Sequence, residues 1–524
     1  MMKYKIDILL VVIILSIFGC TKNWDDHYIK HPETVNVNVW DAIKDRSELS
    51  RFVGLMIKYK YDSLFLSSDN VYTLFVPDNS AFDKLVGSQV HDTTILSYHI
   101  SRHFILPVDI QGMNKLQTLN DKYATFEYVN GKSFFDDVAL NYESPLYLNG
   151  KFFIMNEVAL PKLNLYEYFA VNNPYLKSYI DKKDSIILDK VKSRPIGFDA
   201  NGNTVYDTIA IKLNLIDSLY FPVSKEFLAR TATFVFPRTQ NYNNALTVMA
   251  QKLGGNNIDY TDIPVKWQED ILIPFLLDHG TFLNMLKVSD FKPMIDPLNK
   301  KKKYNMVNIR GDSVLVNYVP TDKYLSSNGL TYDYANFVIP DSLYSGTDKF
   351  QGEWLARPTG ANKYTWRTNV TVTSTTSFVV ANSYNKGLSN DSVLIVNFTK
   401  GYSGNFNLQF NTRNLFPRKY RMIVYTHMDY GGIYNIYVND LQVKRNPTDL
   451  VSFDYNDYTK TKGIIKSVTG ANFVPTGRYN RFDFYVENIT DYSRAAIRFE
   501  YKGPGNVLNN GLVIDMIEFV PATN

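Results

Sequence analysis

Residues 73–82 read Thr-Leu-Phe-Val-Pro-Asp-Asn-Ser-Ala-Phe, and this stretch decides the fold of the amino-terminal part of the chain. The run from Val71 to Val76 is apolar and β-prone, and it ends at Pro77, which has no N–H to donate to a sheet. Asp78 is well placed to cap a following helix that contains Phe82 and Leu85. We therefore predict a buried strand, a turn and a helix within this short stretch.

Helices are also predicted on both sides of this strand. The earlier one shows apolar side chains at i, i+3, i+4 and i+7, namely Leu49, Phe52, Val53 and Met56. The later one runs through Tyr98 and His99 to Ile100. Further on, Asn149-Gly150 is a dipeptide favoured in tight hairpin turns, and a strand over residues 152–160 follows it.

Three of these motifs, in this order, resemble those of fasciclin domains. They are the stretch 73–82, the pair Tyr98-His99, and Asn149-Gly150 with Val158-Ala159-Leu160-Pro161. The resemblance implies an α+β fasciclin-like domain over residues 35–163. The family usually has a further His in the strand after Asn-Gly, whereas residues 151–156 read Lys-Phe-Phe-Ile-Met-Asn here.

The same pattern repeats further along the chain. Residues 233–237 repeat the strand that ends at Pro77, and Asn328-Gly329 repeats Asn149-Gly150. We predict a second, degenerate fasciclin-like domain with insertions over residues 164–344, including an extra hairpin near residues 199–203. Lys300 to Lys303 also fall here, and they indicate either a solvated loop or a site for an acidic polymer.

The composition changes after Pro340. A polar, glycine-bearing stretch over residues 341–352 is followed by short alternating strands, which indicate an all-β sandwich over residues 345–524. The predicted strands are residues 393–398, 406–410, 420–425, 433–438, 482–486, 496–501 and 512–519. Residues 420–439 and the last strand resemble galactose-binding-like jelly rolls and carbohydrate-binding modules. The predicted fold class is thus α+β fasciclin-like domains, two of them and the second degenerate, followed by a jelly-roll sandwich.

The resemblance to carbohydrate-binding jelly rolls implies a ligand site at one end of the sandwich. Sugars present apolar C–H faces and hydroxyl groups, so their sites combine aromatic rings with polar side chains. The candidates are Tyr402, Tyr430, Asn509 and Asn510. For each ring the alternative is a place in the rim or core. The pair of glutamates that is common in calcium-binding members is not visible in the first strand.

The amino terminus predicts a lipid anchor. Lys3 and Lys5 precede an apolar run from Ile8 to Phe18, and Gly19-Cys20 closes the run in a way that resembles the lipobox of bacterial lipoproteins. We expect residues 1–19 to be a signal peptide, Cys20 to be acylated and residues 20–34 to be a tether. The acidic pair at residues 25–26 is similar to signals that send lipoproteins to the outer face of the outer membrane. The alternative is a secreted protein with a chance cysteine.

Several function classes are disfavoured by composition and motifs. The net charge of +4 over 524 residues is too small for binding nucleic acid by phosphate neutralisation, and a single cysteine cannot form an intrachain disulfide. No zinc-protease, nucleophile-elbow or phosphate-loop motif is present, so no enzyme, metal or cofactor is predicted. His99 and His103, four apart on a predicted helix, are expected to pack rather than to bind metal.

These features together predict a surface lipoprotein that captures an extracellular ligand, expected to be a glycan. Its membrane partner would be an outer-membrane nutrient importer of the starch-utilisation (Sus) type, with a TonB-dependent transporter and that transporter's lipoprotein partner. Adhesion or structural association through the fasciclin-like domains is the alternative from a different class. A hydrolase is the third hypothesis.

Overall fold

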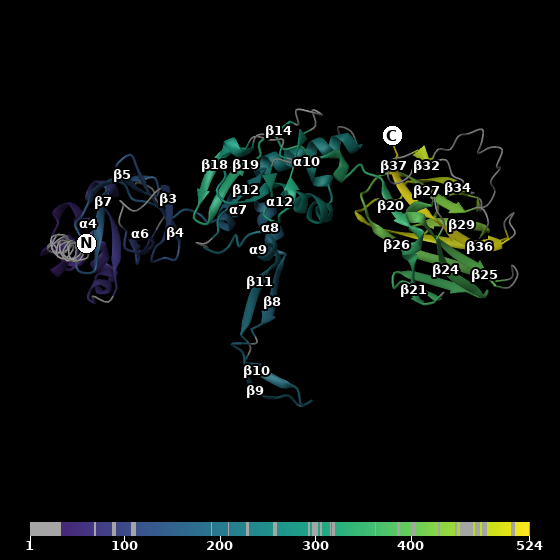
Figure 1. Cartoon of the computed structure of the whole chain (residues 1–524), viewed down its shortest axis with the longest axis horizontal. Coiled ribbons are helices and arrows are strands. Elements are labelled where there is room, and N and C mark those ends of the chain that lie inside the picture. Colours follow the sequence, from purple (N-terminus) through teal and green to yellow (C-terminus); the bar gives the residue numbers. More distant parts are fainter. Residues whose placement is uncertain are drawn as a thin grey trace, which may run out of the picture. The chain divides into compact units, whose positions relative to one another are not determined.

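The computed structural model describes most of the chain from residue 33 onward (Figure 1). The described residues are 33–67, 70–85, 91–105, 112–189, 191–207, 209–226, 230–254, 259–291, 294–295, 302–303, 306–314, 316, 320–361, 363–384, 388–399, 404–427, 430–445, 448–450, 465–466, 472–473, 479–504 and 509–522. They fall into two compact units. The first comprises the chain up to residue 239 together with residues 276–336, and the second comprises residues 240–275 and 337–524. The five segment boundaries predicted above are finer than this division and stay predictions.

The first unit begins with a mixed sheet and the helices around it. The helices are α3 (Val39–Ile43), α4 (Ser50–Lys58), α5 (Asn79–Asp83) and α6 (Asp92–Tyr98). The strands are β1 (Tyr72–Pro77), β2 (Ile100–Ser101), β3 (Gly112–Gln117), β4 (Tyr123–Val129), β5 (Lys132–Phe135), β6 (Val138–Glu143) and β7 (Gly150–Met155). They form a seven-stranded sheet in the order β2-β1-β7-β6-β5-β4-β3.

The stretch 73–82 folds as its residues predict. Every residue of β1 is buried, and the carboxylate of Asp78 accepts a hydrogen bond from the Ala81 N–H at the start of α5. Strand β1 pairs in parallel with β7, from Tyr72 opposite Gly150 to Pro77 opposite Met155. The parallel pair joins the two sequence motifs at the centre of the domain.

His99 has the packed role that the sequence favours, but the predicted His99–His103 helix is wrong. Helix α6 ends at Tyr98 and the chain turns into β2, so the two imidazoles do not share a helix face. His99 is fully buried, with Nδ1 2.7 Å from the Ile95 carbonyl oxygen and Nε2 accepting from the Ala159 N–H. Burial lowers the pKa of His99 to about 4, so the ring is neutral at physiological pH.

The rest of the first unit repeats this design with insertions. Strands β12 (Ala232–Phe236) and β19 (Gly329–Asp333) pair in parallel in a four-stranded sheet that also contains β13 (Thr281–Leu283) and β18 (Thr321–Ser326), in the order β13-β12-β19-β18. Its helices are α7 (Leu165–Asn172), α8 (Pro174–Asp181), α9 (Leu215–Leu219) and most of α12 (Ile273–Gly280). Helix α10 (Thr239–Gly254) belongs to the second unit except for Thr239. The predicted repeat is therefore present.

The asparagine that precedes each parallel strand performs the same task in both copies. Asn149 is fully buried, and its Oδ1 accepts from the Val39 N–H at the start of α3. Asn328 is also fully buried, and its Oδ1 accepts from the Leu165 N–H at the start of α7. Each asparagine thus fastens the first helix of its domain to the central strand.

An insertion of two stacked hairpins projects from the second copy as an arm (Figure 1). It consists of β9 (Arg194–Phe198) paired with β10 (Thr204–Asp207), preceded and followed by β8 (Asp184–Leu188) paired with β11 (Ala210–Asn214). The hairpin predicted near residues 199–203 is the outer of the two. Of the lysine run, Lys302 and Lys303 form the short strand β15, paired with β14 (Met294–Ile295); residues 300–301 lie outside the described part.

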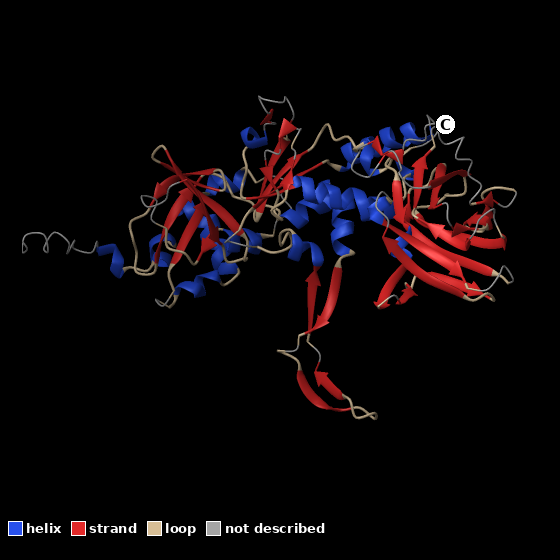
Figure 2. Ribbon diagram, turned by 45° about the vertical axis from the view of Figure 1, so that its right-hand side comes forward, coloured by secondary structure: helices blue, strands red, loops and turns tan. Residues whose placement is uncertain are grey.

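The second unit contains the sandwich, shown as strands in Figure 2. One sheet has the order β20-β37-β27-β34, a second β23-β26-β35-β29-β30, and a third β24-β25-β36-β28. The strands are β20 (Asp348–Gln351), β23 (Val370–Ser374), β24 (Phe378–Tyr384), β25 (Ser392–Phe398), β26 (Phe406–Leu415), β27 (Tyr420–His427), β28 (Tyr430–Gly431), β29 (Ile433–Val438), β30 (Leu441–Gln442), β34 (Tyr479–Val486), β35 (Ser493–Gly503), β36 (Asn509–Ile514) and β37 (Met516–Pro521). Between β20 and β23, the chain forms a separate hairpin of β21 (Ala356–Gly360) and β22 (Lys363–Trp366).

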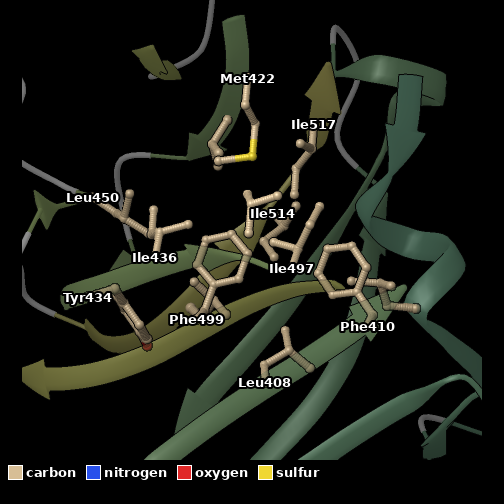
Figure 3. Close-up of a cluster of buried hydrophobic side chains, with 14 of the residues drawn as sticks. Leu408, Phe410, Met422, Tyr434, Ile436, Leu450, Ile497, Phe499, Ile514 and Ile517 are labelled. Atoms are coloured by element: carbon tan, nitrogen blue, oxygen red, sulfur yellow. The ribbon is translucent and has the colours of Figure 1, made fainter. Parts of the chain in front are cut away.

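A buried apolar layer holds these sheets together. Inward-facing residues alternate with outward-facing ones along β26, β29 and β35, as expected for a sandwich. Figure 3 shows the centre of this core, where Tyr434 and Phe499 lie among aliphatic side chains. The rings of Tyr434 and Phe499 are 6.3 Å apart and nearly perpendicular.

The last predicted strand, residues 512–519, is two strands. It breaks at Asp515, with β36 in one sheet and β37 in another. The Asp515 N–H donates to the Tyr425 carbonyl, while the Asp515 carbonyl accepts from the Gly352 N–H. These bonds to distant segments replace a continuous ladder, which is why the apolar pattern alone did not reveal the break.

Candidate functional site

The structure brings together three of the four predicted ligand-binding residues. Strands β28 and β36 run parallel, with Tyr430 opposite Asn509 and Gly431 opposite Asn510. Tyr402 lies outside the described residues. The backbone of Tyr430, Asn509 and Asn510 therefore forms one strand end of the sandwich, and we call this the β28–β36 end.

Asn510 is the polar side chain at this end whose geometry is defined. It is 7% exposed, and its Nδ2 donates to the Tyr501 hydroxyl at 2.7 Å. Its Oδ1 is buried and accepts no hydrogen bond from any described residue. A buried acceptor without a donor costs about 1–3 kcal/mol, and a water molecule or a ligand hydroxyl has the chemistry to satisfy it.

The neighbouring tyrosines hold Asn510 in place. Tyr501 packs edge-on against Phe398 and Tyr434, with ring centroids 5.1 and 5.5 Å away. The Tyr434 hydroxyl donates to the Gly511 carbonyl at 2.6 Å, and burial raises the pKa of Tyr434 well above its ordinary value. The Tyr434 hydroxyl therefore stays protonated and acts as a donor, whereas the Tyr501 hydroxyl accepts from Asn510.

Gly432 packs closely against Asn510 and its neighbouring tyrosines. A Cβ atom at Gly432 would lie 2.9 Å from the Tyr501 ring and 3.3 Å from Asn510 Oδ1. Any other residue here would press on both groups. The side chains of Tyr430 and Asn509 are not among those described, so their part in the site stays a prediction.

Tyr434 and Tyr501 were missed as site residues by sequence reasoning. Both occupy inward positions of strands β29 and β35, where aromatic residues are common in any sandwich core. Alternation alone gives no reason to single them out. Their contact with Asn510 depends on two strands that are far apart in the sequence.

The described side chains of this end offer hydrogen-bonding groups and aromatic rings. Among the described residues no cluster of three or more His, Cys, Asp or Glu side chains could hold a metal ion. Asn510 offers one acceptor for a hydroxyl or amide donor, and the aromatic cluster behind it fixes its direction. In the same described part of the chain, no helix is long and apolar enough to span a membrane.

Comparison with known proteins identifies the first domain. The sequence profile of the fasciclin domain matches residues 47–161, which lie within the predicted first domain. A search of curated proteins found no match. The fold class predicted from the sequence is confirmed, with mixed α+β fasciclin-like domains followed by an all-β jelly-roll sandwich.

Among solved structures, the chain is similar to a family 35 carbohydrate-binding module from Clostridium thermocellum, at 14% identity and a TM-score of 0.20, covering 34% of this chain and 99% of that one. It is also similar to the family 35 module from Paenibacillus barcinonensis, at 14% identity and a TM-score of 0.19, covering 33% of this chain and 99% of that one. A third is the domain pair of the insect cell adhesion molecule Fasciclin I, at 11% identity and a TM-score of 0.20, covering 56% of this chain and 98% of that one.

Proposed function

We propose that this protein is a lipid-anchored surface protein of a bacterium and that its sandwich captures an extracellular glycan. The observation that carries the proposal is the buried, unpartnered Oδ1 of Asn510 at the β28–β36 end. In this proposal Cys20 carries the anchor and the protein faces the cell exterior. Its role would be that of an accessory to an outer-membrane nutrient importer of the Sus type.

A sugar hydroxyl has the chemistry that the β28–β36 end lacks. It donates a hydrogen bond, whereas Asn510 Oδ1 accepts one, and the Tyr501 hydroxyl already occupies Asn510 Nδ2. Tyr430, paired with Asn509 along the backbone, would supply the ring that packs against the apolar face of the sugar. The described residues thus provide one half of a sugar site, and Tyr430 would provide the other.

A glycan array with the full chain tests this proposal. We expect retention of at least one polysaccharide class and its loss in Asn510→Leu, which keeps the side-chain volume but removes the acceptor. Tyr430→Ala is the second variant, because it leaves the Asn510–Tyr501 bond intact. Asn411→Ala, at an exposed position of β26, is the matched control and should bind like the unaltered protein.

Three outcomes of these measurements would count against the proposed glycan site. Absence of binding across a broad panel would favour adhesion, and product release from any substrate would favour a hydrolase. Equal loss of binding in Asn411→Ala would show that the β28–β36 end is not the site. Thermal melting of each variant separates lost binding from lost folding.

Adhesion through the fasciclin-like domains is the second candidate, and the hairpin arm favours it. On the arm, Ile186, Ile196 and Phe198 are 78%, 66% and 76% exposed. Exposed apolar side chains of this kind are common at protein contacts. If adhesion is the function, the double variant Ile196→Ser with Phe198→Ser should abolish cell clumping while leaving the glycan array unchanged.

A further inference from the structure

A cleft of about 540 Å³ lies within the second unit, away from the β28–β36 end. Its walls come from the helical turn around Trp267, the segment 342–348 and the adjoining ends of β26 and β35. Its volume falls within the range of small-molecule sites. Arg494, on this cleft, and Tyr501, at the other site, are seven residues apart on β35, which corresponds to roughly 23 Å of strand.

Buried aromatic rings form the floor of the cleft. The Trp267 and Phe416 rings meet edge to face at 5.4 Å, and Tyr344 lies 6.5 Å from Phe416. The Tyr420 hydroxyl donates to the Phe416 carbonyl at 2.7 Å. All four side chains are buried, and the floor is aromatic.

The rim carries an unpaired positive charge. Arg413 forms an ion pair with Asp348, and Lys266, beside the cleft, pairs with Asp270 at 2.8 Å. Arg494 is exposed, and its side chain forms no ion pair or hydrogen bond with any residue that the structure describes. The cleft therefore has one guanidinium group free to bind an anion.

Polar and aromatic groups flank this guanidinium. Asn414 is the cross-strand partner of Arg494, so the two side chains lie next to each other on one face of the sheet. The Asn414 Nδ2 donates to Asp270 at 3.3 Å, which leaves its Oδ1 as an acceptor. Tyr492 is half-buried in the same wall, with Lys266 Nζ 5.9 Å from its ring centroid and its hydroxyl hydrogen-bonded to Asn414.

We propose that this cleft is a second binding site and that it takes an acidic saccharide. The carboxylate of the sugar pairs with Arg494, because a guanidinium matches a carboxylate with two parallel hydrogen bonds. The sugar ring lies against Tyr492, and one of its hydroxyls donates to Asn414 Oδ1. An anionic sugar is favoured over a neutral one because only the anion forms an ion pair with the Arg494 guanidinium.

The test is isothermal titration calorimetry of the full chain with digalacturonate. We expect one molecule to bind, with an affinity that falls at least about tenfold in Arg494→Ala and is partly kept in Arg494→Lys. The neutral counterpart, in which hydroxymethyl groups replace both carboxylates, should bind at least about tenfold more weakly. Arg357→Ala removes the same charge from an exposed strand position outside the cleft, and it should have no effect.

Several results would overturn this inference. They are an absence of measurable binding, equal affinity for the neutral disaccharide, and equal weakening by Arg357→Ala. Asn510→Leu should leave digalacturonate binding unchanged, since it alters only the β28–β36 end. If Asn510→Leu abolished this binding and Arg494→Ala did not, the saccharide would belong to the first site and the cleft proposal would be wrong.

Discussion

Asp515 is a carboxylate in an environment that favours its neutral form. It is 3% exposed, and burial raises its pKa to about 8, although the Ser389 N–H donates to it at 3.1 Å. In the unfolded chain the group ionises at its ordinary pKa of 3.8. At pH values between these two pKa values, Asp515 is therefore protonated in the folded state and ionised in the unfolded state.

The consequence is a stability that decreases toward alkaline pH. The contribution of Asp515 is fully present below its unfolded pKa and is lost as the pH rises through its folded pKa. Asp515→Asn is neutral at every pH, so it should be more stable than the unaltered protein by roughly 1–3 kcal/mol near pH 9, with the difference shrinking as the pH falls. Calorimetric melting between about pH 5 and pH 9 measures this.

Asp491→Asn is the matched control for this change. Asp491 is exposed in the same unit, so removing its charge should leave the pH dependence of melting unaltered. If Asp515→Asn melted with the same alkaline decline as the unaltered protein, Asp515 would not be the group responsible.

At the scale of elements, the junction of β1 and β7 makes the strongest demand on residue type. Gly150 has φ of +147°, and a Cβ atom there would lie 1.9 Å from the Tyr72 carbonyl oxygen. Gly150→Ala must therefore move β1 away from β7, and we expect a loss of roughly 2–4 kcal/mol in the free energy of unfolding. Denaturant unfolding of the full chain, followed by tyrosine and tryptophan fluorescence, measures the loss.

Gly54→Ala should raise the free energy of unfolding, in contrast to Gly150→Ala. Gly54 lies inside α4, and a Cβ atom there would meet nothing within 4 Å. Alanine should stabilise this helix by up to about 1 kcal/mol, since it loses less backbone entropy than glycine. Equal destabilisation by both variants would contradict the role assigned to the β1–β7 junction.

The same elements show how far the sequence could predict this structure. The strand 73–77, the Asp78 cap and the repeat at Asn328-Gly329 follow from local patterns, and all are present. The bond from the Val39 N–H to Asn149 spans 110 residues, and no local pattern contains it. The break at Asp515 and the Asn510–Tyr501 contact were missed for the same reason, because each depends on strands that meet only after folding.

At the scale of the whole molecule, the proposed function depends on how the protein is held at the membrane. Removing residues 1–19 takes away Lys3, Lys5 and Asp7, so the net charge changes from +4 to +4 − 2 + 1 = +3. A nearly neutral protein has little electrostatic attraction to anionic lipids. Acyl chains on Cys20 would therefore supply the attachment, at about 0.8 kcal/mol for each buried methylene.

This reasoning predicts a membrane-bound protein that a high-salt wash does not release. Cys20→Ser should move it to the soluble fraction of the expressing bacterium, because no site for acylation remains. Mass spectrometry of the mature protein should find an amino-terminal Cys20 that carries fatty acyl groups. Ser16→Ala, which alters the apolar run without touching the acylation site, is the control and should stay membrane-bound. A mature chain that starts elsewhere and dissolves in the medium would instead support the secreted alternative, in which ligand capture cannot serve an importer on the same cell.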